Sequence, residues 1–247
     1  MHSYRERIYN SYVDAIGSTL FPYSKEEYEL DRALFKKNYS KHLPIDKNTK
    51  ILELGCGQGL FAYFLQKEGY TNYTGVDTSP QQLEIAKRMA GIGDRGKFIQ
   101  KDVFAFLGES IGKYRLIVAR HILEHMKKDE VIQFLDLIYN ALEDGGKVII
   151  EVPNALHFFA GYSRYIDFTH EVLFTQDSLK EVLAVCKFKD IIIAPVNSDL
   201  VHSFRSILRI FMKMIWRIFL KALFYIEHGI PNRKIFFDIS IYAIATK

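Results

Sequence analysis

Short apolar runs alternate with segments of helical periodicity through most of the chain. The apolar runs predict six strands, at residues 50–54, 73–77, 97–100, 114–119, 147–153 and 189–195. The segments between them predict helices at about 60–67, 81–90, 129–142 and 175–185. Nearly continuous apolar strands that alternate with helices are typical of a parallel sheet covered on both faces. The pattern therefore predicts a doubly wound α/β fold.

Two further segments flank this predicted core. Residues 1–45 are rich in tyrosine and helical in pattern, and we expect them to form a helical cap. A seventh strand, at 236–246, follows the sixth only after about forty residues, whereas a hairpin loop normally needs about two to five. We therefore expect a helical insertion before the last strand. The whole forms one domain over residues 1–247, with the cap at 1–45, the core at 46–195 and 236–247, and the insertion at 196–235.

Residues 205–224 of the insertion read RSILRIFMKMIWRIFLKALF, with cations at Arg205, Arg209, Lys213, Arg217 and Lys221. The cations repeat every four residues, which is longer than the 3.6 residues of a helical turn. They therefore spiral around the helix and leave a wide apolar face. One interpretation is that this face packs on the sheet or in a homodimer, through Ile207, Leu208, Phe211, Ile215, Phe219 and Phe224. Another is a peripheral membrane helix, with Trp216 at the acyl boundary. Nucleic acid is disfavoured because the basic residues are confined to one apolar helix.

The composition of the chain shows how its charge is distributed and whether disulfide bonds are expected. The chain carries 33 basic and 29 acidic residues, a net charge of +4, and residues 203–228 alone carry five basic residues against one acidic. The uncharged runs between these cations are three residues long, which is too short for a membrane span. Two cysteines, Cys56 and Cys186, are too few for a disulfide framework, and the N-terminal sequence lacks the apolar run of a secretory signal. We therefore expect a cytoplasmic protein, at the inner face of the membrane if the basic helix binds lipid.

The sequence ILELGCGQG, residues 51–59, predicts a strand that runs into a glycine turn and then a helix. Gly55, Gly57 and Gly59 would let the backbone approach a ligand closely at the helix N-terminus. The pattern departs from the dinucleotide fingerprint GxGxxG, whose third glycine would fall at Leu60. Acidic residues also stand at or after the ends of three successive strands, namely Glu53, Asp77 and Asp102. They converge on the edge where open α/β sheets bind ligands.

The segments ELGCGQG, GVD, KDV and YRLIVARHILEHM resemble class I S-adenosylmethionine-dependent methyltransferases over residues 48–153. The resemblance implies a Rossmann-like, mostly parallel seven-stranded sheet, with S-adenosyl-L-methionine as cofactor and S-adenosyl-L-homocysteine as product. The cofactor-binding residues that it implies are Glu53, Gly55, Cys56, Gly57, Gly59, Asp77, Thr78, Asp102, Val103, Ala119, Arg120 and His121. Asp77 would hold the ribose, and Asp102 with Val103 the adenine. The alternative is that the glycines only form a turn and the aspartates only cap helices. For Glu53 the alternative is an indirect role, without contact with the cofactor.

Residues 121–125, HILEH, also spell H-x-x-E-H, a pattern found in zinc sites. Their position after a parallel strand favours the methyltransferase interpretation, and spacing offers no third ligand, so we expect no metal. By the resemblance His121 faces the pocket, either in contact with substrate or in a structural role. We expect Glu124 to cap or orient a group near the cofactor, and His125 to be packed or hydrogen-bonded.

A second cluster lies in YIDFTHEVLFT, residues 165–175, where Asp167, His170 and Glu171 stand beside aromatic residues. An alcohol is a poor nucleophile until its proton is removed, so a histidine supported by a carboxylate suits the role of base. The candidate catalytic residues are His170 as the favoured base, Asp167 as its support and His121 as the second candidate. The pattern D-x-T-H-x-x-x-F-T also resembles methyltransferases of bacterial surface-polysaccharide and lipopolysaccharide pathways. The alternative is that Asp167 and His170 only fix a loop.

These expectations combine into one predicted function. The chain would be an S-adenosylmethionine-dependent methyltransferase that O-methylates a sugar hydroxyl, or a related group, of a surface glycan or glycolipid. One alternative is a small-molecule O- or N-methyltransferase in which the basic helix is a dimer interface or lid. Another is a non-catalytic subunit with a methyltransferase fold. If the N-terminal cap closes over the site, Tyr9, Tyr12 and Tyr23 would suit stacking on a sugar ring.

Overall fold

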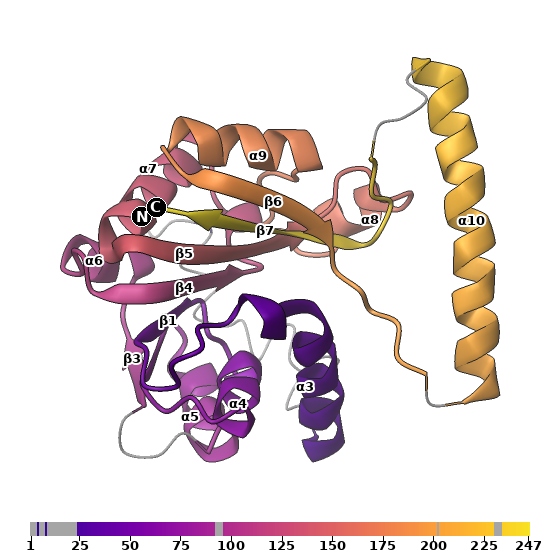
Figure 1. The fold of residues 1–247 in the computed structure, drawn as a ribbon. Helices are drawn as coiled ribbons and strands as arrows, with labels where there is room; N and C mark the ends of the chain where they lie inside the picture. The colour runs from indigo at the N-terminus through magenta and orange to yellow at the C-terminus, as the bar shows by residue number, and fades with distance from the viewer. Residues whose placement is uncertain (1–3, 5–7, 9–23, 92–95, 202, 230–233) are drawn as a thin grey trace.

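The computed structural model describes residues 4, 8, 24–91, 96–201, 203–229 and 234–247. Within them, seven strands form one sheet in the order β3-β2-β1-β4-β5-β7-β6 (Figure 1). Six strands share one direction, and β7 lies antiparallel between β5 and β6. The strands are β1 Ile51–Leu54, β2 Tyr73–Asp77, β3 Lys97–Gln100, β4 Tyr114–Arg120, β5 Leu142–Pro153, β6 Lys189–Pro195 and β7 Ser240–Thr246. The predicted doubly wound, mostly parallel sheet is confirmed.

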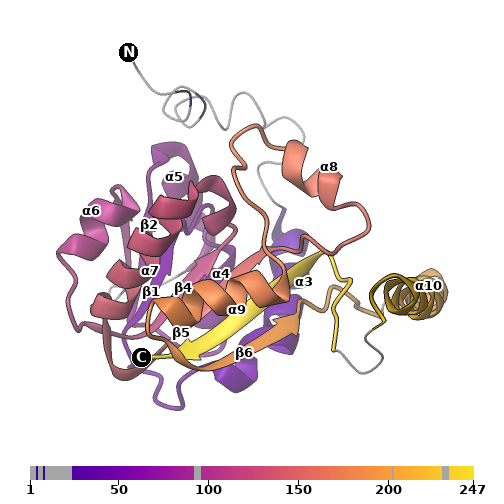
Figure 2. The same cartoon turned by 90° about the horizontal axis from the view of Figure 1, so that it is seen from above.

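Helices cover both faces of the sheet, so that the molecule has three layers (Figures 1 and 2). One layer contains α3 Lys25–Tyr39, α4 Leu60–Lys67 and α5 Pro80–Met89, and the other contains α6 Val103–Gly108, α7 Lys128–Ala141 and α9 Gln176–Val185. Shorter elements are the 3-10 turns η1 Ser40–His42 and η2 Leu123–His125 and the helix α8 Ala160–Tyr165. The four helices predicted in the core are confirmed, whereas α6 and α8 were not predicted.

Apolar side chains on both faces of the strands explain the two helical layers. Phe134, Leu135 and Ile138 of α7 are completely buried on one face, and Phe61 and Phe64 of α4 are completely buried on the other. Burial of this kind stabilises the fold by roughly 1.5–3 kcal/mol for each large apolar side chain. Charged and polar groups are therefore concentrated at the strand ends, where the loops meet.

The helix α3 is the described part of the predicted N-terminal cap. It begins with a capping box, in which Ser24 Oγ accepts from the Glu27 backbone N–H at 3.2 Å and Glu27 Oε2 accepts from the Ser24 N–H at 2.6 Å. Further along, the Tyr28 hydroxyl donates to the Gln58 carbonyl oxygen at 2.6 Å. The helix therefore lies against the glycine loop. The proposed lid residues Tyr9, Tyr12 and Tyr23 lie outside the described residues.

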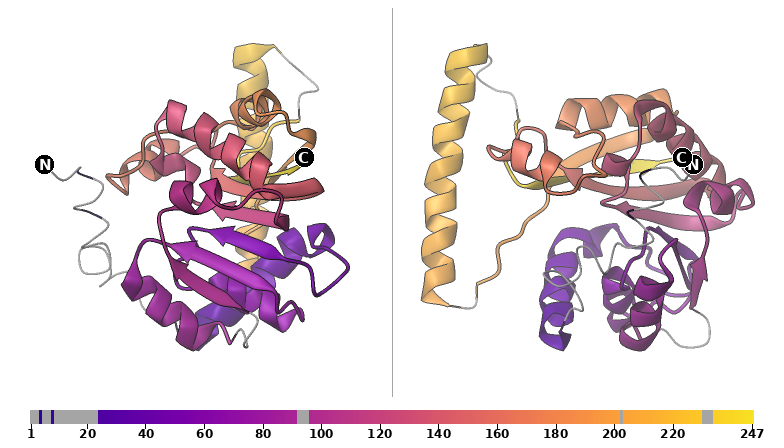
Figure 3. Two further views of the ribbon diagram at one scale, coloured as in Figure 1. Left: turned by 90° about the vertical axis from the view of Figure 1, so that its left-hand side faces the viewer. Right: turned by 180° about the vertical axis from the view of Figure 1, so that it is seen from behind.

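The basic helix is α10, Phe204–His228, and it lies between β6 and β7 in the chain, where the insertion was predicted. Ser203 caps its N-terminus, and Gly229 ends it in the left-handed conformation. The helix stands beside the sheet end near α8, apart from both helical layers (Figures 1 and 3). Its buried residues are Ser206 and Leu220. No helix in the described part of the chain is long and apolar enough to cross a membrane.

The structure does not support the interpretation that α10 packs on the sheet through its apolar face, because Lys213 and Arg217 face inward and most of its apolar side chains are exposed. Lys213 Nζ lies 2.6 Å from Asp199 Oδ1, and Arg217 pairs with Asp238. These two acids lie in the segments that connect α10 to β6 and β7. The predicted packing residues are roughly half exposed, at 46–52% for Ile207, Leu208, Phe211, Ile215 and Phe219, and Phe224 is partly exposed.

Candidate active site

The glycine loop follows β1 and leads directly into α4. The backbone N–H groups of Gly55 and Cys56 both donate to the Val76 carbonyl oxygen, at 2.8 and 3.1 Å, which ties the loop to the end of β2. Gly59 has a φ of 77°, and a Cβ atom there would lie 3.0 Å from the Cβ of Ala86 in α5. The turn and its close packing on α5 therefore both require glycine.

Asp77 lies at the end of β2 and holds two backbone N–H groups. Its Oδ2 accepts from Gly57 and its Oδ1 accepts from Ser79, both at 2.9 Å. Burial raises the pKa of Asp77, and the backbone hydrogen bonds offset part of this rise. Each carboxylate oxygen has two lone pairs, so one remains on each oxygen after these bonds. The predicted pairing of Asp77 with two ribose hydroxyls is therefore compatible with its structural role.

Asp102 caps the unpredicted helix α6. Its Oδ1 accepts from the backbone N–H groups of Phe104 and Ala105, both at 3.0 Å. This is the helix-capping role that the sequence left open as an alternative. Val103 is buried in the first turn of the same helix. Contact of Asp102 and Val103 with an adenine stays a prediction.

Glu53 and Cys56 are buried beneath the loop. Glu53 is 3% exposed and accepts a hydrogen bond from the Tyr73 hydroxyl. Burial raises the pKa of Glu53 to about 7, although the Tyr73 hydrogen bond and the Arg120 charge act in the opposite direction. The Cys56 thiol is 5% exposed, and it lies so close to Gly75 that a Cβ there would meet Sγ at 2.9 Å. The side chain of Cys56 is therefore not placed to contact a cofactor, and Glu53 fits an indirect role better.

A buried charge cluster lies at the ends of β4 and β5. Arg120 Nε lies 2.6 Å from Glu151 Oε2, and the Tyr39 hydroxyl donates to the same oxygen at 2.7 Å. The Arg120 guanidinium also lies 4.2 Å from the ring centroid of Phe35 in α3. The side chain of Glu151 is therefore paired and hydrogen-bonded, which is how proteins retain a buried carboxylate.

His121 lies at the surface end of this cluster, with its side chain 44% exposed. Its φ of 51° is rare outside glycine, and its Nε2 lies 3.3 Å from Glu151 Oε1 while its Nδ1 lies 3.2 Å from Glu124 Oε1. Burial alone would lower the pKa of His121, but the Glu151 charge and the two carboxylate contacts raise it to about 10. The raised pKa favours the protonated form of His121 at neutral pH, which argues against a role as a base. The role of His121 in catalysis stays a prediction.

The 165–175 loop is held against η2 by backbone hydrogen bonds. The Glu124 carbonyl oxygen accepts from the N–H groups of Glu171 and Val172, at 2.6 and 3.2 Å. These bonds bring His170 next to His125, with their ring centroids 4.7 Å apart and edge to face. His125 is hydrogen-bonded and packed, as expected, and the ring on which it packs is that of the favoured base.

Hydrogen bonds assign the support of each imidazole. The Thr169 hydroxyl donates its proton to Asp167 Oδ1 at 2.7 Å. The same hydroxyl oxygen lies 2.7 Å from His125 Nδ1, so it accepts a hydrogen bond from the Nδ1–H of His125. His170 Nδ1 lies 2.7 Å from the Ser163 carbonyl oxygen, which can only accept. Asp167 therefore supports His125 through Thr169, and Ser163 supports His170. Support of His170 by the Asp167 carboxylate stays a prediction.

Exposed aromatic side chains border this cluster. Phe158, Phe159, Tyr162, Tyr165 and Phe168 are 55–80% exposed, and all lie within or next to α8. Phe158 meets Trp216 of α10 edge to face, with ring centroids 5.2 Å apart. Tyr4, from the N-terminal segment, packs edge-on against Phe168 and donates to Glu171. The apolar surface of α10 is therefore continuous with the rim of the histidine cluster.

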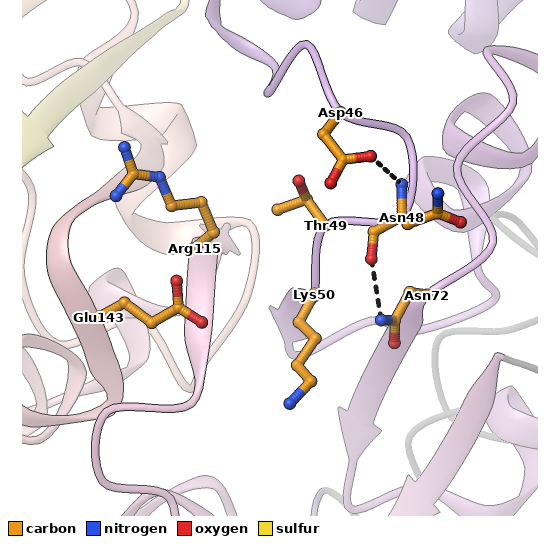
Figure 4. A pocket seen from close by; sticks show the side chains of 7 residues that line it. All are labelled: Asp46, Asn48, Thr49, Lys50, Asn72, Arg115 and Glu143. Atoms are coloured by element: carbon orange, nitrogen blue, oxygen red, sulfur yellow. Dashed lines mark hydrogen bonds between the residues drawn. The ribbon is translucent and has the colours of Figure 1, made fainter.

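A polar pocket lies at the opposite edge of the sheet, before the first residues of β1, β2 and β4 (Figure 4). It is lined by Asp46, Asn48, Thr49, Lys50, Asn72, Arg115 and Glu143. Asn48 bridges its wall by donating to Asp46 and accepting from Asn72, both at 3.0 Å. Open α/β sheets bind ligands at the other edge, at the carboxyl ends of the strands. The candidate active site is therefore the edge that carries the glycine loop and the histidines.

Comparison with known proteins identifies the family. The model of a methyltransferase domain matches residues 25–189. The chain belongs to this methyltransferase family. A solved S-adenosylmethionine-dependent methyltransferase from Archaeoglobus fulgidus has the same fold, with a TM-score of 0.63 and 21% identity over 89% of this chain and 94% of that one. The methyltransferase class and the fold predicted from the glycine loop are confirmed.

Two relatives illustrate the range of acceptors. A ubiquinone biosynthesis O-methyltransferase of Vibrio parahaemolyticus is 35% identical over 31% of this chain and 33% of its own length. A Methanocaldococcus jannaschii protein provisionally named as a protein N5-glutamine methyltransferase is 30% identical over 58% of this chain and 72% of its own. The chain thus spans about a third of the Vibrio enzyme. Neither relative is named for a glycan, so the resemblance to surface-polysaccharide enzymes stays a proposal.

Several residues of the site escaped the sequence analysis. Glu151 carries a signal, because it is the one charged residue within an otherwise apolar run, VIIEVP. Thr169 belongs to the D-x-T-H pattern, but the pattern does not indicate its contact with His125. Tyr39 and Ser163 carry no signal in their local sequence.

Proposed function

We propose that the protein transfers a methyl group from S-adenosylmethionine to a hydroxyl group that binds beside the histidine cluster. The donor set at the glycine loop fits this cofactor. Asp77 has a lone pair left on each oxygen for ribose hydroxyls, and Asp102 Oδ2 and the backbone of Val103 lie at the next strand end for the adenine. The carboxylates of Glu53 and Asp77 also suit a cationic ligand. S-adenosylmethionine would supply a methyl group on a sulfonium, which makes it transferable to a nucleophile.

The tautomer of His170 carries the proposal. Because Nδ1 donates to the Ser163 carbonyl, the neutral ring keeps its lone pair on Nε2. An alcohol becomes a good nucleophile as its proton is removed, so this lone pair supports activation of an acceptor hydroxyl at His170. The protonated form of His121, which its raised pKa favours, is better suited to hold Glu124 and Glu151 in place.

The test separates cofactor binding from transfer. S-adenosylhomocysteine binding is measured by calorimetry, and transfer of isotopically labelled methyl is followed into lipid-linked glycan, small metabolites, protein and RNA from a lysate of the source cell. We expect His170→Gln to bind S-adenosylhomocysteine normally and to lose transfer by about a hundredfold or more. Full transfer by His170→Gln would refute the role of His170. Cofactor binding without transfer to any fraction by the native protein would favour the non-catalytic subunit.

The exposed apolar surface of α10 supports an acceptor that is linked to a lipid. The most specific form of this proposal is a sugar hydroxyl of a glycolipid. Met212, Ile218 and Ile226 of α10 are 56–72% exposed, and Arg205 and Lys221 are exposed among them. An amphipathic helix with these features binds the interface of a membrane. Contact between Phe158 and Trp216 would bring the rim of the histidine cluster to the same interface. A small-molecule acceptor, with α10 as a dimer interface, is the alternative.

Flotation with vesicles of anionic and neutral lipids tests the membrane contact. We expect the native chain to float with anionic vesicles, and Ile218→Asp to lose at least about half of that binding without a change in melting temperature. Ile111→Asp is the matched control, because Ile111 is 74% exposed at the opposite edge of the sheet. A dimer on a sizing column that Ile218→Asp converts to a monomer, together with no flotation, would instead support the dimer interface.

A further inference from the structure

Three side chains next to one another offer the ligand atoms of a metal site. Glu124, His125 and His170 each place one such atom within 4.8 Å of the other two. They come from two segments, the turn η2 and the 165–175 loop, which the Glu124 carbonyl joins by its two backbone hydrogen bonds. Two imidazoles and one carboxylate form a common ligand set for zinc and related transition metals.

The hydrogen bonds of the two imidazoles are those of metal ligands. A histidine that binds a metal through one nitrogen usually donates its other N–H to a carboxylate or a backbone carbonyl, which fixes the ring and its tautomer. His170 donates from Nδ1 to the Ser163 carbonyl, and His125 donates from Nδ1 to Thr169, which passes the bond to Asp167. In both neutral rings Nε2 then carries the lone pair that a metal needs.

Glu124 provides an independent observation. Its side chain is 1% exposed; Oε1 contacts His121, and Oε2 is a buried oxygen with no hydrogen-bond partner in the described part of the chain. A buried carboxylate oxygen without a partner destabilises the fold, because the hydrogen bonds that it loses to water are not replaced. A cation bound between Glu124 and the two imidazoles would remove this penalty.

We propose that Glu124, His125 and His170 bind one divalent transition-metal ion of the zinc type, with a coordination position left open for the acceptor oxygen. Bonds of about 2.0–2.2 Å to nitrogen and carboxylate oxygen would bring the three ligand atoms to about 3.4 Å from one another. The 165–175 loop therefore closes slightly onto η2 when the ion binds. Mg²⁺ and Ca²⁺ prefer oxygen ligands and bind this set weakly.

The ligand set differs from the one that the H-x-x-E-H pattern suggests. In that pattern His121 and His125 would share the ion, but both nitrogens of His121 already contact carboxylates. The third ligand, His170, comes from 45 residues further along the chain than His125, which is why spacing did not reveal it. The open position rests on the proposed function, because there the ion would lower the pKa of a bound hydroxyl. With the ion in place, His170 acts as a ligand and not as a free base.

Titration of the purified full chain with Zn²⁺, after treatment with a chelator, tests the site. We expect one Zn²⁺ to bind per chain, Co²⁺ to give a visible absorption spectrum of low coordination number, and Mg²⁺ to bind far more weakly. His170→Gln and Glu124→Gln should each weaken Zn²⁺ binding by at least about tenfold, and Thr169→Val by about tenfold to a hundredfold. His228→Ala is the matched control, since His228 is exposed at the end of α10.

Two outcomes overturn the proposal. One is the lack of stoichiometric Zn²⁺ binding by the native chain, and the other is Zn²⁺ binding that His170→Gln and Glu124→Gln leave unchanged. His170 is partly exposed, so its variant remains informative if Glu124→Gln fails to fold. S-adenosylhomocysteine binding is measured on the same samples. If the native chain binds S-adenosylhomocysteine but does not bind Zn²⁺, the metal site alone is refuted. If it binds Zn²⁺ but transfers no methyl group, the proposed function alone is refuted.

Discussion

His121 Nε2 lies 3.3 Å from Glu151 Oε1, and this contact joins the residue after β4 to a buried carboxylate near the end of β5. The pKa of His121 is about 10 in the folded protein against about 6.5 in an unfolded chain. A raised pKa contributes stability that is complete below about pH 6.5 and is lost as the pH rises through about 10.

The first prediction follows from this pair. The free energy of unfolding of the native chain should fall, relative to that of His121→Gln, as the pH rises from about 6.5 to 10. Urea unfolding at several pH values in this range measures the difference, and the comparison cancels the titration of other groups. Parallel stability curves for the two proteins would show that Glu151 does not hold the His121 proton.

A second prediction concerns Asp77 and the cofactor. Asp77→Asn replaces one accepting oxygen by an N–H donor, so the side chain can no longer accept from both Gly57 and Ser79 and also bind two hydroxyls. S-adenosylhomocysteine should bind about tenfold to a hundredfold more weakly, as measured by calorimetry. Glu84→Gln is the control, since Glu84 is exposed on the neighbouring helix α5 and pairs only at the surface with Lys87. Equal affinities of Asp77→Asn and the native chain would exclude Asp77 as the ribose ligand.

A third prediction separates backbone strain from close packing in the glycine loop. Gly59 and Gly112 both have positive φ, at 77° and 59°, but only at Gly59 would a Cβ meet neighbouring atoms. Gly112→Ala should destabilise the chain by about 1 kcal/mol through backbone strain. Gly59→Ala should add a further 1 kcal/mol or more, because Ala86 lies 3.0 Å from the new atom. If thermal unfolding gives equal losses for the two variants, the packing of the loop on α5 is looser than described.

A fourth prediction concerns the anchor of α10. Lys213 Nζ lies 2.6 Å from Asp199 Oδ1; burial would raise the pKa of Asp199, but the hydrogen bond and charge of Lys213 lower it below its usual value. Lys213→Ala should therefore speed limited proteolysis in the segment 196–203 by several-fold and leave the melting temperature nearly unchanged. Lys221→Ala is the control, because Lys221 is exposed on the same helix. Equal cleavage rates for both variants would mean that the inward-facing cations do not hold α10.

The sequence predicted the elements whose signal is local. Strands β1 to β7 and the core helices follow from apolar runs and periodicity, and the glycines and Asp77 follow from a strand that ends in a turn. The helix α6 was missed because it has only six residues, too few for a periodic pattern. The orientation of α10 was left open, because the partners of its cations, Asp199 and Asp238, could not be assigned to it by periodicity alone.

The site contains residues whose role depends on distant contacts, and these were not predictable. Glu151 is 112 positions from Tyr39 in the chain, and Thr169 is 44 positions from His125. A contact between residues so far apart in the chain produces no periodic pattern in the sequence around either of them. The Thr169 contact of His125 and the Ser163 contact of His170 were therefore not predicted, although both histidines had been singled out.

The β6–β7 connection has a consequence for how such chains diversify. Pro195 pairs with Ile241, and the Val196 N–H donates to the Ser240 carbonyl at 3.0 Å, so the ladder is already closed where α10 departs and returns. Segments between two such neighbouring points can be lengthened, shortened or exchanged without a change in the sheet. The flanks of this connection bond to the core through Asn197 and Asp238, but α10 itself is an exchangeable attachment, and one methyl-transferring core could be directed to a lipid surface, a partner protein or free solution by replacing it.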